Sequence, residues 1–349
     1  MRCLASLAAG CLLLAAVPSP AAPGGQASDA ASRTVRARYL MGTVFRIEAP
    51  SAVDPEATAA ALESALDEVG RQDKILSNWD SGSETSRLNA AAGRGRIPVS
   101  SGLLSAVTES LGWAAATGGV FDPTVEPLTR PFRGQAPARA PARPGESRPR
   151  WTAVEVDRER GTVALPPGSG LDFGGIGKGI ALDEAAAVLR RLGVANALLD
   201  AGGQLLALGA PPGEPGWRVA VADPAQRERP RVVLLLKDAS AATSGNSERP
   251  GEILDPATGR SVAGAGSATA IAARATDADA LSTALFVMGA RRGLDYARGR
   301  ADLIALFLNP SREKAPVVAN LPSDAESTLF LIQGPPDPHQ DRRLRVEAR

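Results

Sequence analysis

The stretch Leu171-Asp172-Phe173-Gly174-Gly175-Ile176-Gly177-Lys178-Gly179 runs into a helix-periodic segment from Gly179 to Leu192, which Gly193 closes. It therefore predicts a glycine-rich turn that leads into a helix. Glycines let a backbone approach a ligand closely, amides at a helix start favour an anion, and Lys178 adds a positive charge. From these residues alone, an anion-binding site and a tight strand-to-helix turn are both compatible with the pattern.

Two common nucleotide-binding motifs do not fit this stretch. A P-loop requires Gly-x4-Gly-Lys-Ser/Thr, but Asp172 stands where the first glycine belongs and Gly179 follows the lysine. A dinucleotide-binding fingerprint requires Gly-x-Gly-x-x-Gly, whereas Gly175, Gly177 and Gly179 are spaced Gly-x-Gly-x-Gly. No suitable βαβ unit surrounds them.

A second pattern is Asp279-Ala280-Leu281-Ser282-Thr283, within a helical periodicity that runs from Thr276 to Met288 and ends at Gly289. A spacing of four residues places the Asp279 carboxylate and the Thr283 hydroxyl on one helix face. Oxygen ligands of this kind suit a hard cation such as Mg²⁺. An aspartate near a helix start is also a common partner of the helix dipole, so the pattern alone leaves both roles open.

Two further segments look purely structural when read alone. Ile253-Leu254-Asp255-Pro256-Ala257-Thr258-Gly259 predicts an Asp-Pro turn ended by glycine. Thr243-Ser244-Gly245-Asn246 predicts a polar loop.

The remaining periodicities predict an α+β fold, because strands and helices are interspersed without a regular βαβ rhythm. Strand patterns lie at 36–48, interrupted at Met41-Gly42-Thr43, and at 197–199, 231–236, 303–308 and 329–332, with a hairpin at 153–165. Helical patterns follow Pro55, with Leu62, Leu66 and Val69, and Ser101, with Leu104, Val107 and Leu111, the latter ended by Gly118-Gly119. The segment 77–89 predicts a polar loop, and Phe121 begins a loop that continues into a Pro/Arg-rich surface excursion at about 133–150.

Composition excludes several classes of function. The 349 residues include 39 Lys+Arg and 38 Asp+Glu, so the net charge of +1 gives no sign of a nucleic-acid-binding surface. Aromatic residues make up only 4%, which argues against stacking platforms for single-stranded nucleic acid. The single histidine is His339, which excludes a Ser-His-Asp triad, a histidine-ligated zinc site and a haem.

The N-terminus predicts export. Residues 1–21 combine Met1-Arg2, an apolar run too short for a membrane span, and a small-residue cleavage site at Ser19-Pro20-Ala21, as in a signal peptide. Both cysteines lie in this segment, so the mature chain would contain none.

A soluble periplasmic or cell-envelope protein is favoured. Ala9-Gly10-Cys11 faintly resembles a lipoprotein box, so a lipid anchor, the only expected route to the membrane, stays open. We expect a flexible leader at 22–35, one domain at 36–335 and a polar tail at 336–349.

Taken together and in order, these segments resemble the ApbE family, the flavin transferases that attach FMN to proteins using FAD. The matching pieces span roughly 38–310 and are Met41-Gly42-Thr43, Leu76-Ser77-Asn78-Trp79, Ser83-Glu84, Arg87-Leu88-Asn89, Phe121–Leu128, Leu171–Gly179 with Asp183, Ala201-Gly202-Gly203, Thr243-Ser244-Gly245, Asp255–Gly259 and Ala278–Gly289. The resemblance implies a mixed fold with a largely antiparallel sheet flanked by helices. It also implies Mg²⁺-dependent transfer of FMN from FAD to a threonine of an acceptor protein through a phosphoester bond, with release of AMP.

The resemblance also implies the site residues. Contacts with FAD would come from Met41, Trp79, Val120, Phe121, Asp122, Asp172, Lys178 and Ile253. The metal would be held by the Gly175 carbonyl, Asp279 and Thr283, with a contact from Ser282. In this arrangement Lys178 faces the pyrophosphate.

Three positions depart from the family pattern. Glu252 replaces the usual histidine, the favoured candidate for the base that activates the acceptor threonine, and Asp255 is the alternative base. Ser247 and Gln204 replace the usual tyrosine and aspartate. FAD and Mg²⁺ binding are therefore better supported than transfer to protein. An FAD pyrophosphatase that yields FMN and AMP, and a flavin-binding protein without turnover, are the alternative functions.

Overall fold

The computed structural model describes residues 33–51, 54–133, 151–247, 251–264, 266–311 and 314–321. The predicted signal peptide, most of the leader, the Pro/Arg-rich excursion after Arg133, the strand at 329–332 and the polar tail lie outside the described residues. Within the described ranges, no helix is both long enough and apolar enough to cross a membrane.

A single antiparallel sheet of eight strands forms the centre of the molecule, in the order β1-β2-β6-β7-β10-β13-β14-β15. These strands are β1 (Arg33–Leu40), β2 (Thr43–Pro50), β6 (Ala197–Ala201), β7 (Leu205–Leu208), β10 (Ala239–Gly245), β13 (Ser267–Ala272), β14 (Ile304–Leu308) and β15 (Val317–Ala319). The prediction of an α+β fold with a largely antiparallel sheet is confirmed.

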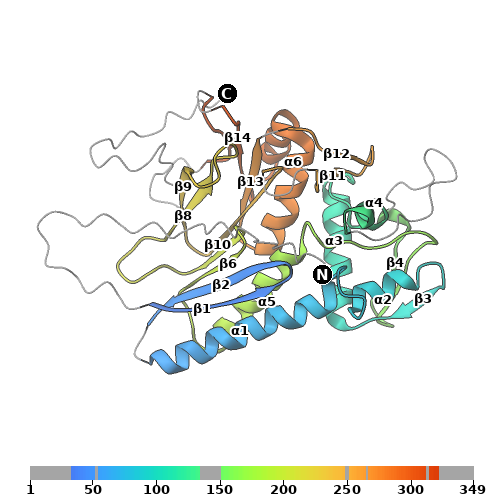
Figure 1. Ribbon diagram of the computed structural model, residues 1–349, viewed down its shortest axis with the longest axis horizontal. Helices are drawn as coiled ribbons and strands as arrows, with labels where there is room; N and C mark the ends of the chain where they lie inside the picture. Colours follow the sequence, from blue (N-terminus) through green and yellow to red (C-terminus); the bar gives the residue numbers. More distant parts are fainter. Residues whose placement is uncertain are drawn as a thin grey trace, which may run out of the picture.

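Three long helices pack on this sheet: α1 (Pro55–Leu76), α5 (Gly177–Arg191) and α6 (Ala275–Arg298). The fully buried side chains of Leu62, Leu66 and Val69 join α1 to the core against β2, β6 and α5, as their spacing predicts. Helix α6 packs against β10, β13 and β14. Figure 1 shows α1 and α5 side by side below β1 and β2, and α6 running up beside β13.

The smaller elements form a cap at one end of the molecule, on the right in Figure 1. They are α2 (Glu84–Ala90), α3 (Ser101–Ala116), α4 (Glu126–Thr129), the 3₁₀ turns Pro123–Val125, Arg130–Arg133 and Trp151–Ala153, and a sheet of β3 (Arg96–Pro98), β5 (Thr162–Ala164) and β4 (Glu155–Asp157). Two hairpins complete the fold. One pairs β8 (Trp217–Ala222) with β9 (Pro230–Leu236), and the other pairs β11 (Leu254–Asp255) with β12 (Arg260–Ser261).

The interruption at Met41-Gly42 is a hairpin turn. Positive φ values of 50° at Met41 and 76° at Gly42 turn β1 directly into β2, so that Leu40 pairs with Thr43. The hairpin at 153–165, the buried strand from Ala197 and the turn at Asp255–Gly259 are confirmed as well.

Several predicted boundaries are wrong, each for a local reason. Strand β1 begins at Arg33, so the leader cannot extend to residue 35. Residues 84–90 of the predicted polar loop form α2, because Ser83 caps it by accepting from Ser86 N. Helix α3 is capped by Ser100 rather than Ser101. Short helical turns replace the loop after Asp122, whose side chain caps the first of them.

The remaining differences concern the segments that build the site. Helix α5 begins at Gly177, two residues earlier than predicted. Gly289, at φ 71° and ψ 166°, ends the predicted helical segment that runs to Met288, and a second segment of α6 continues beyond this break to Arg298. Thr243 and Ser244 belong to strand β10 rather than to a loop, because they pair with Thr269 and Ala268 of β13.

Candidate functional site

A cavity of about 1430 Å³ opens where the β1–β2 turn, the glycine-rich start of α5, the start of α6 and the β8–β9 hairpin meet. It exceeds the roughly 300–1,000 Å³ of most ligand sites, so it can hold a dinucleotide. The predicted site residues that line it are Met41, Trp79, Val120, Phe121, Asp122, Asp172, Gly175, Lys178, Glu252, Ile253, Asp279 and Thr283. Asp255 and Ser282 are not among the lining residues.

The glycine-rich stretch brings the start of α5 against α6. Helix α5 has no side-chain cap at Ile176, so its first amides find acceptors elsewhere, and the Gly177 amide donates to the Phe173 carbonyl at 2.7 Å. The Gly179 amide donates to Asp279 Oδ2 at 3.0 Å, and Lys178 Nζ lies 3.7 Å from Asp279 Oδ1. Two patterns that the sequence presented separately therefore meet at one carboxylate.

Asp279 is 4% exposed, and burial raises its pKa, although Lys178 and the Gly179 amide act in the opposite direction. Its neighbours supply further oxygen atoms. A Cβ placed on Gly175 would lie 3.0 Å from Thr283 Oγ1, so the Gly175 backbone and the Thr283 hydroxyl are close neighbours. A carboxylate, a hydroxyl and a backbone carbonyl form a donor set that fits a hard cation such as Mg²⁺.

This donor set contains few protein ligands. Among the described residues, no group of three or more His, Cys, Asp or Glu side chains could hold a metal ion. A cation here would therefore need oxygens from a bound phosphate or from water, which is the usual situation of Mg²⁺.

Ser282 forms hydrogen bonds at the turn of α6 that carries Asp279 and Thr283. Its hydroxyl donates to the Asp279 carbonyl at 2.9 Å and shares a 2.9 Å hydrogen bond with Ser244 Oγ. Ser244 Oγ also lies 3.5 Å from Thr283 Oγ1. Ser282 therefore supports the turn of α6 that carries Asp279 and Thr283, and it is not among the residues that line the cavity.

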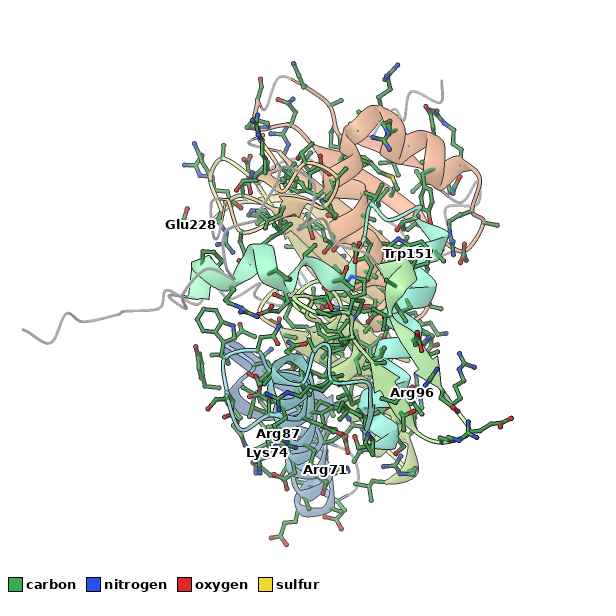
Figure 2. All side chains as sticks on the ribbon, turned by 90° about the vertical axis from the view of Figure 1, so that its right-hand side faces the viewer. Arg71, Lys74, Arg87, Arg96, Trp151 and Glu228 are labelled. Carbon is green, nitrogen blue, oxygen red and sulfur yellow. The ribbon has the colours of Figure 1, made fainter. Side chains whose placement is uncertain are left out.

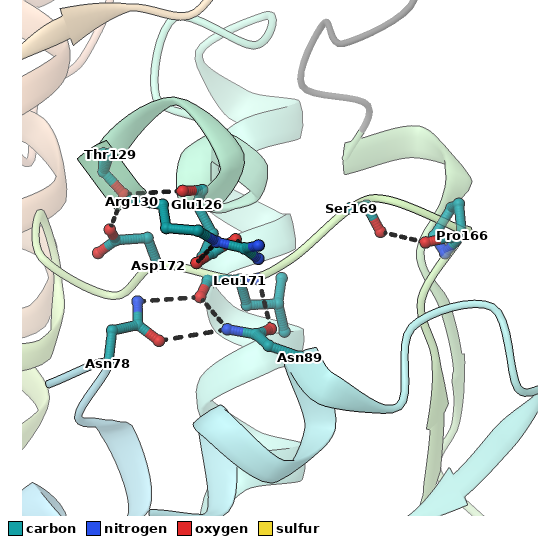
Figure 3. Close-up of polar contacts among 9 residues, drawn as sticks. All are labelled: Asn78, Asn89, Glu126, Thr129, Arg130, Pro166, Ser169, Leu171 and Asp172. Atoms are coloured by element: carbon teal, nitrogen blue, oxygen red, sulfur yellow. Dashed lines mark hydrogen bonds and ion pairs between the residues drawn. The ribbon is translucent and has the colours of Figure 1, made fainter. Parts of the chain in front are cut away.

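An asparagine clamp fixes the segment before the glycines (Figure 3). Asn89 accepts from Leu171 N at 2.7 Å and donates to Leu171 O at 2.9 Å, as a neighbouring strand would. Asn78 donates to the same carbonyl at 3.0 Å. Asp172 then accepts from Gly174 N at 2.8 Å and from the Thr129 hydroxyl. The clamp ties the loop of Trp79 to the loop of Gly175, so both walls of the cavity share one support.

Two lining residues, Asp122 and Trp79, differ sharply in exposure to solvent. Asp122 is buried, accepts from Thr124 N and Thr124 Oγ1 at 2.7 and 2.6 Å, and has a pKa raised by burial. Trp79, which also lines the cavity, is 68% exposed. Arg71 and Lys74, on the exposed side of α1, add positive charge at the rim (Figure 2).

The family model of the ApbE family matches residues 41–307, a segment that contains every element of this site. The chain belongs to the ApbE family. Similar curated proteins are the FAD:protein FMN transferases of Klebsiella pneumoniae, 30% identical over 84% of this chain and 89% of the relative, and of Treponema pallidum, 29% identical over 79% and 84%.

Solved ApbE structures have the same fold. The ApbE protein from Thermotoga maritima superposes with a TM-score of 0.71 and 27% identity, covering 82% of this chain and 97% of its own. The flavin transferase ApbE from Vibrio cholerae superposes with a TM-score of 0.70 and 24% identity, covering 82% and 97%.

The two candidate bases of this ApbE family member lie in different surroundings. Glu252 is exposed and lines the cavity. Asp255 instead stabilises its own turn: its carboxylate accepts from Ala257 N at 2.9 Å and from Thr258 Oγ1 at 3.0 Å. Sequence reasoning assigned no role to Ser244, Asn89 or Thr129. The sequence marked these three residues only as polar side chains that can form hydrogen bonds, which does not reveal their partners.

Proposed function

We propose that this chain transfers FMN from FAD to a threonine of an acceptor protein, depends on Mg²⁺ and releases AMP. The observation that supports it best is the convergence of the α5 start, Lys178, Asp279 and Thr283 on one wall of a dinucleotide-sized cavity. Membership of the ApbE family, whose curated relatives named above are FAD:protein FMN transferases, supports the same reaction.

Different lining residues contact different parts of the bound FAD. Trp79 offers an exposed aromatic face to the isoalloxazine ring. Met41, Val120, Phe121, Asp122, Asp172 and Ile253 provide the remaining contacts with the flavin and the adenosine. The pyrophosphate belongs next to Lys178 at the start of α5, because the ammonium group and the positive end of the helix dipole both attract an anion.

The transfer forms one bond and breaks one. The acceptor hydroxyl oxygen forms a bond to the FMN phosphorus, the P–O bond to the AMP phosphate breaks, and its electron pair leaves on AMP. The hydroxyl proton passes to a base. Lys178 stabilises the negative charge that develops on the pyrophosphate oxygens. Asp279, Thr283 and the Gly175 carbonyl would hold Mg²⁺, whose positive charge supplies further stabilisation.

Glu252 is the better candidate for the base. It lines the cavity from an exposed position, where an acceptor can approach, whereas the carboxylate of Asp255 is occupied within its turn. A carboxylate can take the hydroxyl proton, although its negative charge beside a pyrophosphate opposes substrate binding.

Hydrolysis of FAD to FMN and AMP is the second candidate function, because Glu252 replaces the histidine that the family uses toward an acceptor. Water needs no docking surface, and a carboxylate at position 252 can activate it as well as an acceptor hydroxyl. The two functions differ only in the nucleophile, so the same cavity serves both.

The deciding experiment incubates the mature protein with FAD and Mg²⁺, with and without a threonine-containing acceptor domain. Flavin fluorescence on a denaturing gel and AMP in solution are measured together, with Asp279→Ala as the inactive control. A fluorescent acceptor supports transfer. AMP without labelling supports hydrolysis. Retention of intact FAD with neither product would contradict both and leave a flavin-binding protein.

The N-terminal segment supports export to the periplasm or cell envelope. A signal peptide at 1–21 would be removed, leaving a leader that ends before β1 begins at Arg33, followed by one domain. Sequencing the N-terminus of the protein recovered from the cell envelope tests this. An N-terminus near residue 22 supports a soluble exported protein, and a lipid-modified Cys11 supports an anchored one.

A further inference from the structure

Helices α5 and α6 cross at their first turns with almost no space between the backbones. A Cβ added at Gly179 would lie 2.4 Å from the Ala275 carbonyl oxygen and 2.6 Å from Thr276 Cα. Ala275 and Thr276 are themselves fully buried. The two helix starts therefore share one crowded, dry environment in which every unpaired amide is costly.

Two aspartates satisfy those amides, each from the opposite helix. Asp279 of α6 accepts from Gly179 N of α5 at 3.0 Å. Asp183 of α5 accepts from Ala275 N at 2.9 Å, Thr276 N at 3.0 Å and Thr276 Oγ1 at 2.7 Å, all in the first turn of α6. The arrangement is symmetric. Asp183 lies four residues after Gly179 in α5, and Asp279 lies four residues after Ala275 in α6.

Neither helix provides a cap of its own. The residues at the cap positions, Ile176 and Arg274, make no side-chain cap hydrogen bond. Gln204 holds the remaining side of the α6 start, since its Nε2 donates to the Ala275 carbonyl at 2.9 Å. The direction of the first turn of α6 is thus fixed mainly by Asp183, and Asp279 and Thr283 follow within the next two turns.

We propose that Asp183 is a positioning residue for the cation site: its bonds to Ala275 and Thr276 hold Asp279 in place for Lys178 and for a divalent cation. This inference rests on the function proposed above. Asp183 does not touch the cavity, whereas Asp279 and Lys178 line it. Its effect must therefore pass through the crossing of the two helices.

The physical consequence of removing Asp183 follows from the bonds it makes. Two buried amides and one hydroxyl of α6 would lose their acceptor, and the first turn of α6 would move or fray to reach water. Asp279 would then lose its alignment with Gly179 N. Replacement of groups that orient metal ligands typically lowers metal affinity about 10–100-fold, and we expect a loss in that range here.

The test compares Asp183→Ala and Asp183→Asn with Asp54→Ala. Asp54 caps α1 through Glu56 N and Ala57 N at 3.0 and 2.9 Å, so its loss has a comparable effect on a helix start but lies outside the cavity lining. Mg²⁺ alone is titrated into each protein by calorimetry, and exchange of the Gly179 amide is followed by NMR.

We expect both Asp183 variants to bind Mg²⁺ about tenfold or more weakly and to exchange the Gly179 amide faster, with Asp183→Asn the milder because it keeps one acceptor oxygen. Asp54→Ala should change neither. Unchanged Mg²⁺ affinity and Gly179 protection in a folded Asp183 variant would overturn the inference. If the unaltered protein binds no Mg²⁺ but Gly179 exchange still responds to Asp183, the proposed function fails and the coupling of the helices stands.

Discussion

At the scale of single residues, Asp122 is a carboxylic acid in an apolar environment. Burial raises its pKa above that of an unfolded aspartate, so the folded protein binds this proton more tightly than the unfolded chain does. The resulting stabilisation is complete below the unfolded pKa of about 3.9 and is lost as pH rises through the higher folded pKa.

Asp122→Asn should therefore gain stability relative to the unaltered protein as pH rises from about 4 to about 7. The asparagine keeps an acceptor for Thr124, while the cost of ionising a buried group disappears. One unit of pKa difference corresponds to about 1.4 kcal/mol, or roughly 3–6 °C in Tm for a domain of this size. Thermal unfolding of the ligand-free proteins across this range provides the measurement; a constant difference at every pH would contradict it.

Glu252 carries the second prediction at this scale, because it lines the cavity and the proposed function assigns it the role of the base. If it acts as the base, Glu252→Gln should lower the rate of AMP formation by about 10²-fold or more, while Glu252→His should keep or raise it. Initial rates at saturating FAD provide the test. If Glu252→Gln leaves the rate of AMP formation unchanged, the base lies elsewhere, and Asp255 is the next candidate.

Asn89 belongs to the same scale, although its effect reaches a whole loop. Asn89→Ala leaves both Leu171 N and one bond to Leu171 O without their side-chain partner, which should cost about 2–3 kcal/mol and weaken FAD binding. Asn78→Ala removes one bond to the Leu171 carbonyl and the bond that Asn78 accepts from Asn89 Nδ2 at 3.2 Å, but it leaves the Leu171 amide paired and should cost less. Urea unfolding and FAD titration compare the two variants. Equal effects would mean that the clamp on the Leu171 amide is unimportant.

At the scale of secondary-structure elements, the crossing of α5 and α6 decides the geometry of the site. Gly179→Ala places a methyl group against the Ala275 carbonyl, so we expect a loss of about 3 kcal/mol or more and a displaced Asp279. Gly112→Ala in α3 is the matched control: no atom outside its own helix lies within 4 Å of the added Cβ, and alanine should stabilise the helix by about 0.5–1 kcal/mol. Denaturant midpoints measure both. A tolerated Gly179→Ala would refute the close crossing.

At the scale of the whole molecule, the cavity connects the sheet, the cap and the β8–β9 hairpin, so ligands should stabilise the entire fold. FAD and Mg²⁺ together, each at about 100 times its Kd, should add several kcal/mol, since each contributes about 2.7 kcal/mol by mass action. Removal of Mg²⁺ with a chelator should lower the Tm of the protein loaded with FAD and Mg²⁺ more than that of the protein loaded with Mg²⁺ alone. Equal shifts would show that the cation and FAD bind independently.

Patterns of local sequence predicted much of the fold and the nature of the ligand groups. The alternation broken at Met41-Gly42 and the apolar spacing of Leu62, Leu66 and Val69 act through neighbouring residues, so they were visible without the structure. The spacing of Asp279 and Thr283 likewise follows from helix geometry alone. The limits of α2 and β10 were missed, because caps and pairing partners, rather than periodicity, fix them.

The sequence by itself therefore determined which chemical groups this protein possesses: a glycine-rich helix start with a lysine, an oxygen-only donor pair, and no histidine in the domain. Only the tertiary structure decided which of them meet. The Gly179 amide and Asp279 are 100 residues apart, and Asn89 and Leu171 are 82 residues apart. Such contacts depend on the packing of whole elements, since no short-range periodicity relates positions that far apart. Asp183 illustrates the difference: in the sequence it is part of the family resemblance without an assigned role, and in the fold it accepts hydrogen bonds from the first turn of α6, the helix that carries Asp279 and Thr283.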